Sequence, residues 1–125
     1  MKKKIISSPQ TPVSGPYSAA VEAEDFIFIS GQLPLDPVTC EMISDVKDAT
    51  RRILLNIQIL LRKTDLDLSH VVKTTIFLKN IKDFSAVNEA YAEFFPEEPP
   101  ARSTIEVAAL PRGALIEIEA VAVRS

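Results

Sequence analysis

Arg102 is the residue whose type and position most directly suggest chemistry in this sequence. It follows the rigid Pro99–Pro100 step and opens a run of strand-forming residues in the segment PPARSTIEV. A guanidinium keeps its charge and grips a carboxylate through two parallel N–H bonds, so a small organic acid is a natural ligand. From spacing alone, a structural ion pair with Glu106, Glu119 or a neighbouring chain's carboxylate is an equally weighted alternative.

Glu117 and Glu119 are the second group of interest, two carboxylates at alternate positions of the closing run IEIEAVAV. A carboxylate that faces a pocket can hold a water molecule and move a proton. Alternate carboxylates also occur where one face of a strand is simply solvated or ion-paired. The spacing leaves both interpretations open.

Other kinds of catalytic centre have little support in the sequence. The one histidine, His70, has no companion at metal-ligand spacing, and the single cysteine, Cys40, lies in a polar turn. Neither a Walker loop nor a GxGxxG motif occurs among the three glycines. We therefore expect no metal site, no disulfide and no organic cofactor.

Composition and charge set the general class of the protein. With 125 residues, 46% of them hydrophobic, the chain is expected to form one domain over residues 1–125. A formal net charge of −3 and scattered basic residues disfavour a nucleic-acid partner. The basic start MKKK is not followed by an apolar signal segment, and no apolar run is long enough for a membrane span. The sequence predicts a cytoplasmic protein without a membrane partner.

Hydrophobic periodicity predicts several strands and two amphipathic helices along the chain. Alternation and β-branched residues predict strands over 3–7, 25–31 and 70–79. Apolar residues at helical spacing predict a long helix that starts from Ser44 as N-cap. A second helix is predicted from its cap Asp83 to the residues before Pro96.

The last two predicted strands each have two distinct faces. Ile105 and Val107 alternate with Arg102, Thr104 and Glu106 in the first strand. In the second strand, Ile116, Ile118, Ala120 and Ala122 alternate with Glu117, Glu119, Val121 and Val123. The loop LPRGA suits a hairpin that places Ile118 across from Val107, so that the helices cover the purely apolar face.

This hairpin would carry Arg102, Thr104, Glu117 and Glu119 together on its other face. That face is too apolar in places for water and too charged for a core, so a partner subunit is expected to cover it. Glu117 would lie opposite Ala108, about 20 Å along the strand from Arg102. Two such residues could act on one small ligand only from different subunits.

Five segments of the chain together resemble the reactive-intermediate deaminase family, RidA or YjgF. They are GPYS, FISGQLP, KTTIFLKNIKDFSAVNEAY, PPARSTIEVAALP and IEIEAVAV, in the family's order over nearly the whole chain. The resemblance implies an α+β fold of the chorismate-mutase type, with two helices packed on one face of a mixed sheet. The same resemblance implies a homotrimer with sites between subunits. It also implies hydrolysis of 2-imino acids and their enamine tautomers, such as 2-aminoacrylate and 2-iminobutanoate, to 2-oxo acids and ammonia without a cofactor.

The resemblance also assigns roles to individual residues. Arg102 matches the carboxylate-binding arginine and Glu117 the water-positioning glutamate, while the pocket lining matches Tyr17, Ser30, Gly31, Asn88 and Thr104. Thr104 stands where many members have cysteine, so a mechanism that needs the thiol would not operate here. A trimer that binds 2-oxo acids as signals, without turnover, is the alternative that the same residues would serve.

Overall fold

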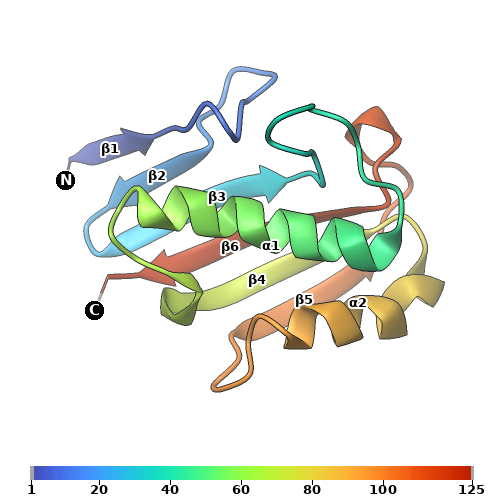
Figure 1. Ribbon diagram of the computed structural model, residues 1–125. Coiled ribbons are helices and arrows are strands. Elements are labelled where there is room, and N and C mark those ends of the chain that lie inside the picture. The colour runs from blue at the N-terminus through green and yellow to red at the C-terminus, as the bar shows by residue number, and fades with distance from the viewer. Residues whose placement is uncertain (1, 125) are drawn as a thin grey trace.

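One mixed β-sheet with two α-helices across one face forms the framework of the protein. The computed structural model describes residues 2–124 (Figure 1). Its strands are β1 (Lys3–Ile6), β2 (Ala20–Ala23), β3 (Phe26–Gln32), β4 (Val71–Leu78), β5 (Ala101–Glu106) and β6 (Ile116–Val123). The helices are α1 (Val46–Arg62) and α2 (Phe84–Ala92), with short 3₁₀ turns η1 (Leu68–His70), η2 (Ile81–Asp83) and η3 (Pro111–Gly113). The predicted α+β class and the helices on one face are confirmed.

The order of the strands, β1-β2-β3-β6-β4-β5, places the C-terminal strand in the interior of the sheet. β4 and β5 are parallel and are joined by the crossover helix α2, whereas the other neighbouring strands are antiparallel. Helix α1 connects β3 to β4, with β6 lying between these two strands.

Helix α1 supplies much of the core that fixes the sheet. Its predicted apolar stripe is fully buried at Ile53, Ile57 and Leu60, which share the core with Ile27 and Ile118 of the sheet. Burial of each such side chain stabilises the fold by about 1.5–3 kcal/mol. No helix within residues 2–124 is long and apolar enough to cross a membrane.

The N-cap of α1 is Asp45 rather than the predicted Ser44. The Asp45 carboxylate accepts a hydrogen bond from the backbone N–H of Asp48 at 3.0 Å. Strand β2 is absent from the sequence prediction, because its four residues AVEA are too few to show a period. It pairs with both β1 and β3 and so fixes the loop that precedes it.

The predicted hairpin of the last two strands is wrong, because β4 lies between β5 and β6. Thr74 of β4 is level with Arg102 on one side and with Ala120 on the other. The segment between the two strands passes the end of β4, where the Lys79 N–H donates to the Leu115 carbonyl at 3.0 Å. The register of Ile118 with Val107 is therefore wrong as well.

The insertion of β4 changes which side chains share a face. Thr74 and Ile76 are buried on the helix-covered face, so their partners Arg102 and Thr104 also face the helices. Glu117 pairs with Phe77, which belongs to the opposite alternation, and it points to the face without helices, called here the open face. The expected grouping of Arg102 and Thr104 with Glu117 and Glu119 on one face is thus wrong.

The open face carries a strip of apolar side chains. Phe26 and Phe28 of β3 stack with ring centroids 6.0 Å apart, and each remains nearly half exposed. Ile105 of β5, expected to lie under the helices, is also on this face and is 46% exposed. Val121 and Val123 of β6 lie beside the two phenylalanines. An apolar surface of this kind is typical of a subunit interface.

Candidate active site

The Arg102 side chain is held by neutral groups on the helix-covered side of β5. Its Nε donates to Thr104 Oγ1 at 2.9 Å and its Nη2 donates to Asn88 Oδ1 at 2.5 Å. The guanidinium carbon lies 4.9 Å from the ring centroid of Tyr91 and 5.4 Å from that of Phe84. These contacts fix the direction of the guanidinium without neutralising its charge.

Helix α2 presents three of these partners because Phe84, Asn88 and Tyr91 are spaced four and three residues apart. Such residues lie on one face of a helix. The spacing of Phe84 and Tyr91 to Asn88 is the sequence signal that points to this group of side chains. The Tyr91 hydroxyl bonds to the buried Thr74 hydroxyl at 2.8 Å, and burial raises the pKa of the phenol, so it remains neutral.

The structural alternative for Arg102, an ion pair within its own chain, is not formed. Within residues 2–124, no carboxylate oxygen lies within 4.0 Å of its guanidinium. Glu106 instead accepts a hydrogen bond from the Ile81 N–H at 2.9 Å, and Glu119 points to the open face. Arg102 borders a shallow groove of about 350 Å³ whose walls also include Tyr91, Phe95 and Pro100.

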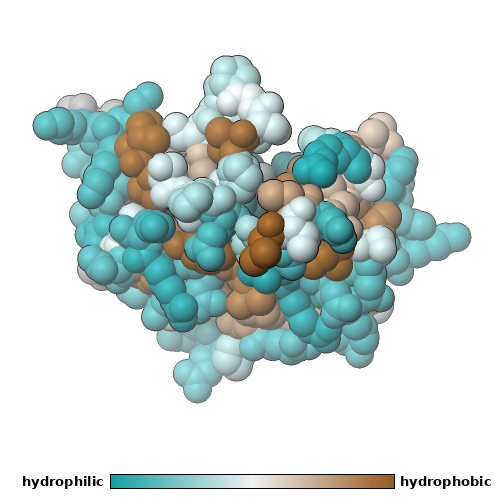
Figure 2. Space-filling model, turned by 45° about the horizontal axis from the view of Figure 1, so that its top comes forward, coloured by the Kyte–Doolittle hydropathy of each residue, from teal (hydrophilic) through white to brown (hydrophobic). Residues whose placement is uncertain are grey.

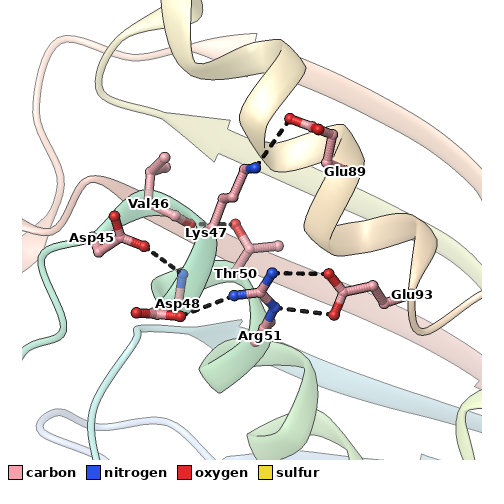
Figure 3. A network of polar contacts seen from close by, with 8 residues as sticks. All are labelled: Asp45, Val46, Lys47, Asp48, Thr50, Arg51, Glu89 and Glu93. Carbon is pink, nitrogen blue, oxygen red and sulfur yellow. Dashed lines mark hydrogen bonds and ion pairs between the residues drawn. The ribbon is translucent and has the colours of Figure 1, made fainter.

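A network of ion pairs anchors α2 to α1 beside this groove (Figure 3). Arg51 donates to both carboxylate oxygens of Glu93, at 3.0 and 2.9 Å, and also pairs with Asp48 at 2.9 Å. Lys47 reaches Glu89 at 3.2 Å. Exposed ion pairs stabilise a fold only slightly, so the principal effect of the network is to orient the helix that carries Asn88 and Tyr91.

Glu117 forms the second cluster, at a bulge where β3 and β6 change register. The pairing runs regularly to Ile29 with Ala120 and resumes at Gln32 with Ile118, which leaves one extra residue in β3. A Cβ added to Gly31 in this bulge would lie 1.9 Å from a carboxylate oxygen of Glu117. The absence of a side chain at Gly31 thus leaves room for the Glu117 carboxylate.

The environment of Glu117 favours proton transfer. Burial raises the pKa of this carboxyl, and the charge of Glu119 raises it further. Within residues 2–124 it forms no ion pair that would oppose these effects. A carboxyl with a raised pKa exchanges a proton more readily near neutral pH than an ordinary glutamate.

Ser30 and Tyr17 complete this cluster. The Ser30 hydroxyl donates to the Ser18 carbonyl at 2.6 Å, and the Ser30 N–H donates to the Ala19 carbonyl at 2.9 Å. These bonds hold the segment that follows Tyr17 against β3. The Tyr17 ring is half exposed and lines a pocket together with Gly31.

The predicted site residues therefore form two clusters in one protomer. Arg102, Asn88 and Thr104 lie on the helix-covered side, whereas Tyr17, Ser30, Gly31 and Glu117 lie around the bulge of β3. Arg102 and Glu117 are two strands and three residues apart, with Cα atoms separated by about 14 Å at ordinary sheet spacings. No three histidine, cysteine or acidic side chains gather as metal ligands within residues 2–124.

Known proteins match this chain over almost its whole length. The family described as Endoribonuclease L-PSP matches residues 8–124. A RutC family protein of Pyrococcus horikoshii is 46% identical, with 98% of each chain covered. A Capra hircus protein named 2-iminobutanoate/2-iminopropanoate deaminase is 43% identical over 98% of this chain and 90% of its own.

The fold is shared with solved structures at clear sequence identity. The crystal structure of Escherichia coli TdcF with bound serine has a TM-score of 0.93 and 38% identity, covering 98% of this chain and 99% of that chain. With the family match over residues 8–124 and relatives above 40% identity, the chain belongs to the Endoribonuclease L-PSP family, the RidA/YjgF family that its motifs resemble.

Proposed function

We propose that this protein hydrolyses 2-imino acids and their enamine tautomers to 2-oxo acids and ammonia, in sites formed between the subunits of a homotrimer. The observation that carries the proposal is the state of Arg102. Its guanidinium is oriented by Asn88, Thr104 and two aromatic rings, yet it has no carboxylate of its own chain within ion-pair distance. The deaminase name of the Capra hircus relative points in the same direction.

The proposed reaction needs positioning and proton transfer. Arg102 holds the substrate carboxylate, and Glu117 accepts a proton from a water molecule as the water oxygen bonds to the C=N carbon. The imine reacts as its N-protonated form, so the addition gives a neutral carbinolamine. Glu117 returns its proton to the nitrogen, and the C–N bond breaks as the hydroxyl oxygen forms the new C=O bond. The hydroxyl proton passes through Glu117 to solvent and balances the proton that the imine took up. One imine and one water thus give one 2-oxo acid and one ammonia. No step in this scheme uses the Thr104 hydroxyl as a nucleophile.

The homotrimer is proposed because it reconciles two features of the protomer. Arg102 and Glu117 lie on different faces of the sheet, so one small substrate cannot contact both within a chain. The open face, with Phe26, Phe28 and Ile105 nearly half exposed, provides the apolar surface for subunit contact. In a closed ring, the open face of one subunit can bring its Glu117 to the groove beside a neighbour's Arg102.

RNA cleavage, which the family's description names, has less support from this chain. The net charge is −3, and the wide cleft lined by Lys2, Lys4 and Lys63 also carries Glu22, Glu24 and Asp65. Such a mixed surface gives no continuous positive track for a phosphate backbone. The single histidine, His70, is engaged with Asp67 in the cap of η1.

Ammonia release tests the proposal directly. An amino-acid oxidase generates the imine of alanine or 2-aminobutyrate in situ, and ammonia formation is followed with and without the protein. The proposal predicts release faster than spontaneous hydrolysis, and a rate proportional to protein concentration. Binding of the 2-oxo acid without acceleration would contradict the enzyme and would favour the binding or regulatory alternative.

A further inference from the structure

A cavity beside Gly31 is separate from the Arg102 groove. It has a volume of about 130 Å³ and lies between the segment 10–17, the residues after β3 and the turn η3. Gly31 and Tyr17 form its wall nearest to Glu117, and Asn56 of α1 and Leu35 lie among its other walls. In the space-filling view, which turns the top of the molecule forward, apolar residues come to the surface between polar ones around these loops (Figure 2).

Thr11 gives this cavity an unused polar group. The residue is only 6% exposed, and its side-chain hydroxyl is buried without a hydrogen-bond partner within residues 2–124. A buried polar atom without a partner costs about 1–3 kcal/mol, so this hydroxyl would gain a hydrogen bond from any ligand group or water that comes within its reach. Thr11 lines the cavity that Gly31 and Tyr17 also line.

Arg112 gives the cavity a positive charge. It is the one formally charged residue among the lining residues, and it forms no ion pair within residues 2–124. Its backbone has φ = 57°, in the left-handed region, within the tight turn η3. A second guanidinium stands behind the wall, where Arg52 Nε donates to Asn56 Oδ1 at 3.1 Å. The cavity therefore favours an anionic group.

From these features we infer that the cavity is a subsite for the substrate side chain and selects 2-imino acids whose side chain ends in a carboxylate. The inference rests on the proposed function, because it takes Glu117 to act at the C=N carbon. Gly31 packs against the Glu117 side chain and also forms a wall of the cavity, so the cavity lies beside the position proposed for the C=N carbon. At about 30 Å³ for each water-sized unit, the cavity holds about four non-hydrogen atoms, the size of a carboxymethyl group.

The selectivity is measured with imines that have the same shape and differ in charge. Imines of aspartate, asparagine and alanine are generated in situ, and kcat/KM for each is compared. Because hydrogen bonds to charged groups are the stronger ones, the wild-type protein is expected to prefer the aspartate imine to the asparagine imine by about tenfold or more. Arg112→Gln should bring this ratio close to one, and Arg112→Lys should retain part of it.

Thr11→Val provides the second test, since it removes the hydroxyl and keeps the shape of the side chain. It is expected to lower kcat/KM for both longer imines several-fold without lowering the melting temperature, because no hydrogen bond within the chain is lost. Arg62→Gln, an exposed change on α1 away from the cavity, is the matched control and should leave all three rates unchanged. Equal wild-type rates for the aspartate and asparagine imines, or a ratio unaltered by Arg112→Gln, would overturn the inference.

A failure of the proposed function is distinguished by a binding measurement. If no imine is hydrolysed faster than in buffer, calorimetry with 2-oxosuccinamate and oxaloacetate, the oxo acids of the same two side chains, tests the subsite alone. Tighter binding of oxaloacetate, lost in Arg112→Gln, would support the subsite while the enzyme proposal fails. Equal affinity for the two probes would overturn the subsite as well.

Discussion

Arg102 and Glu117 lie on opposite faces of the same β-sheet. Arg102 is level with the buried Thr74 and points toward α2, whereas Glu117 is level with Phe77 and points to the open face. The sheet itself therefore separates the two residues on which the proposed reaction depends. Any substrate that contacts both must lie between two subunits.

Replacement of Arg102 by lysine tests whether the guanidinium holds the substrate. A lysine keeps the charge but cannot form the planar two-bond grip on a carboxylate. We therefore expect kcat/KM to fall, with a loss of about 2–4 kcal/mol in transition-state stabilisation. Steady-state ammonia release from the alanine imine measures the loss. Arg62→Lys, at an exposed position on α1, is the control. Near-normal turnover in Arg102→Lys would assign Arg102 a structural role only.

Gly31→Ala tests the close approach of β3 to Glu117. The added methyl group would occupy a position 1.9 Å from the Glu117 carboxylate and must displace it, so activity is expected to fall at least tenfold with the fold retained. Gly113→Ala is the control for a glycine-to-alanine change away from Glu117. A Cβ at Gly113 meets nothing within 4 Å, but its φ of +70° makes alanine there cost about 1 kcal/mol of stability. Full activity in Gly31→Ala would separate Glu117 from the reaction.

Local sequence patterns predicted the helices and strands of this fold well, but they did not predict which strands pair with one another. Alternation within IEIEAVAV correctly separates Ile118 from Glu117, and helical spacing correctly buries Ile53 and Ile57. The alternation of apolar and polar residues does not show which strand is the neighbour in the sheet. The short segment between β5 and β6 is compatible with a hairpin, and only the long-range packing of β4 excludes it.

For the candidate site too, the sequence indicated individual residues but not how the fold arranges them. Arg102 and Glu117 were recognisable from their types and from the family motifs, and their separation between faces depends on the position of β4. Ile105 was assigned to the core because an apolar side chain on a strand does not by itself show whether its face is covered by helices or left exposed. The Thr74–Tyr91 hydrogen bond joins elements whose contact no local pattern encodes.

Glu119→Gln tests the electrostatic control of Glu117. As the base, Glu117 must be ionised, so kcat/KM falls as the pH drops through its pKa. Burial, and then the charge of Glu119, raise this pKa above the ordinary value of 4.5. Removal of the Glu119 charge is expected to move the acid limb of the pH profile, where kcat/KM falls, to lower pH. Burial still keeps the pKa of Glu117 above 4.5. An acid limb that does not move, or that moves upward, would contradict this assignment.

The same raised pKa predicts that Glu117 limits stability at neutral pH. A raised pKa in the folded state means that the favourable contribution is present below the ordinary pKa of 4.5 and is lost as the pH rises through the raised value. Glu117→Gln is therefore expected to melt at a higher temperature than the wild type at pH 7, with the difference reduced near pH 4. Thermal unfolding followed by circular dichroism measures both. A lower melting temperature at pH 7 would reveal a favourable partner for the carboxylate.

The subunit-crossing site is tested most directly by mixing two inactive variants. Arg102→Ala and Glu117→Gln are prepared separately, unfolded together and refolded, and mass spectrometry confirms that hybrids form. In a closed ring in which each site takes Arg102 from one subunit and Glu117 from the next, random assembly restores roughly a quarter of the sites. Ammonia release from the alanine imine is expected to recover to about that fraction of the wild-type rate. Confirmed hybrids that remain as inactive as the separate variants would contradict the account, because Arg102 and Glu117 would then not act on the same substrate from different subunits.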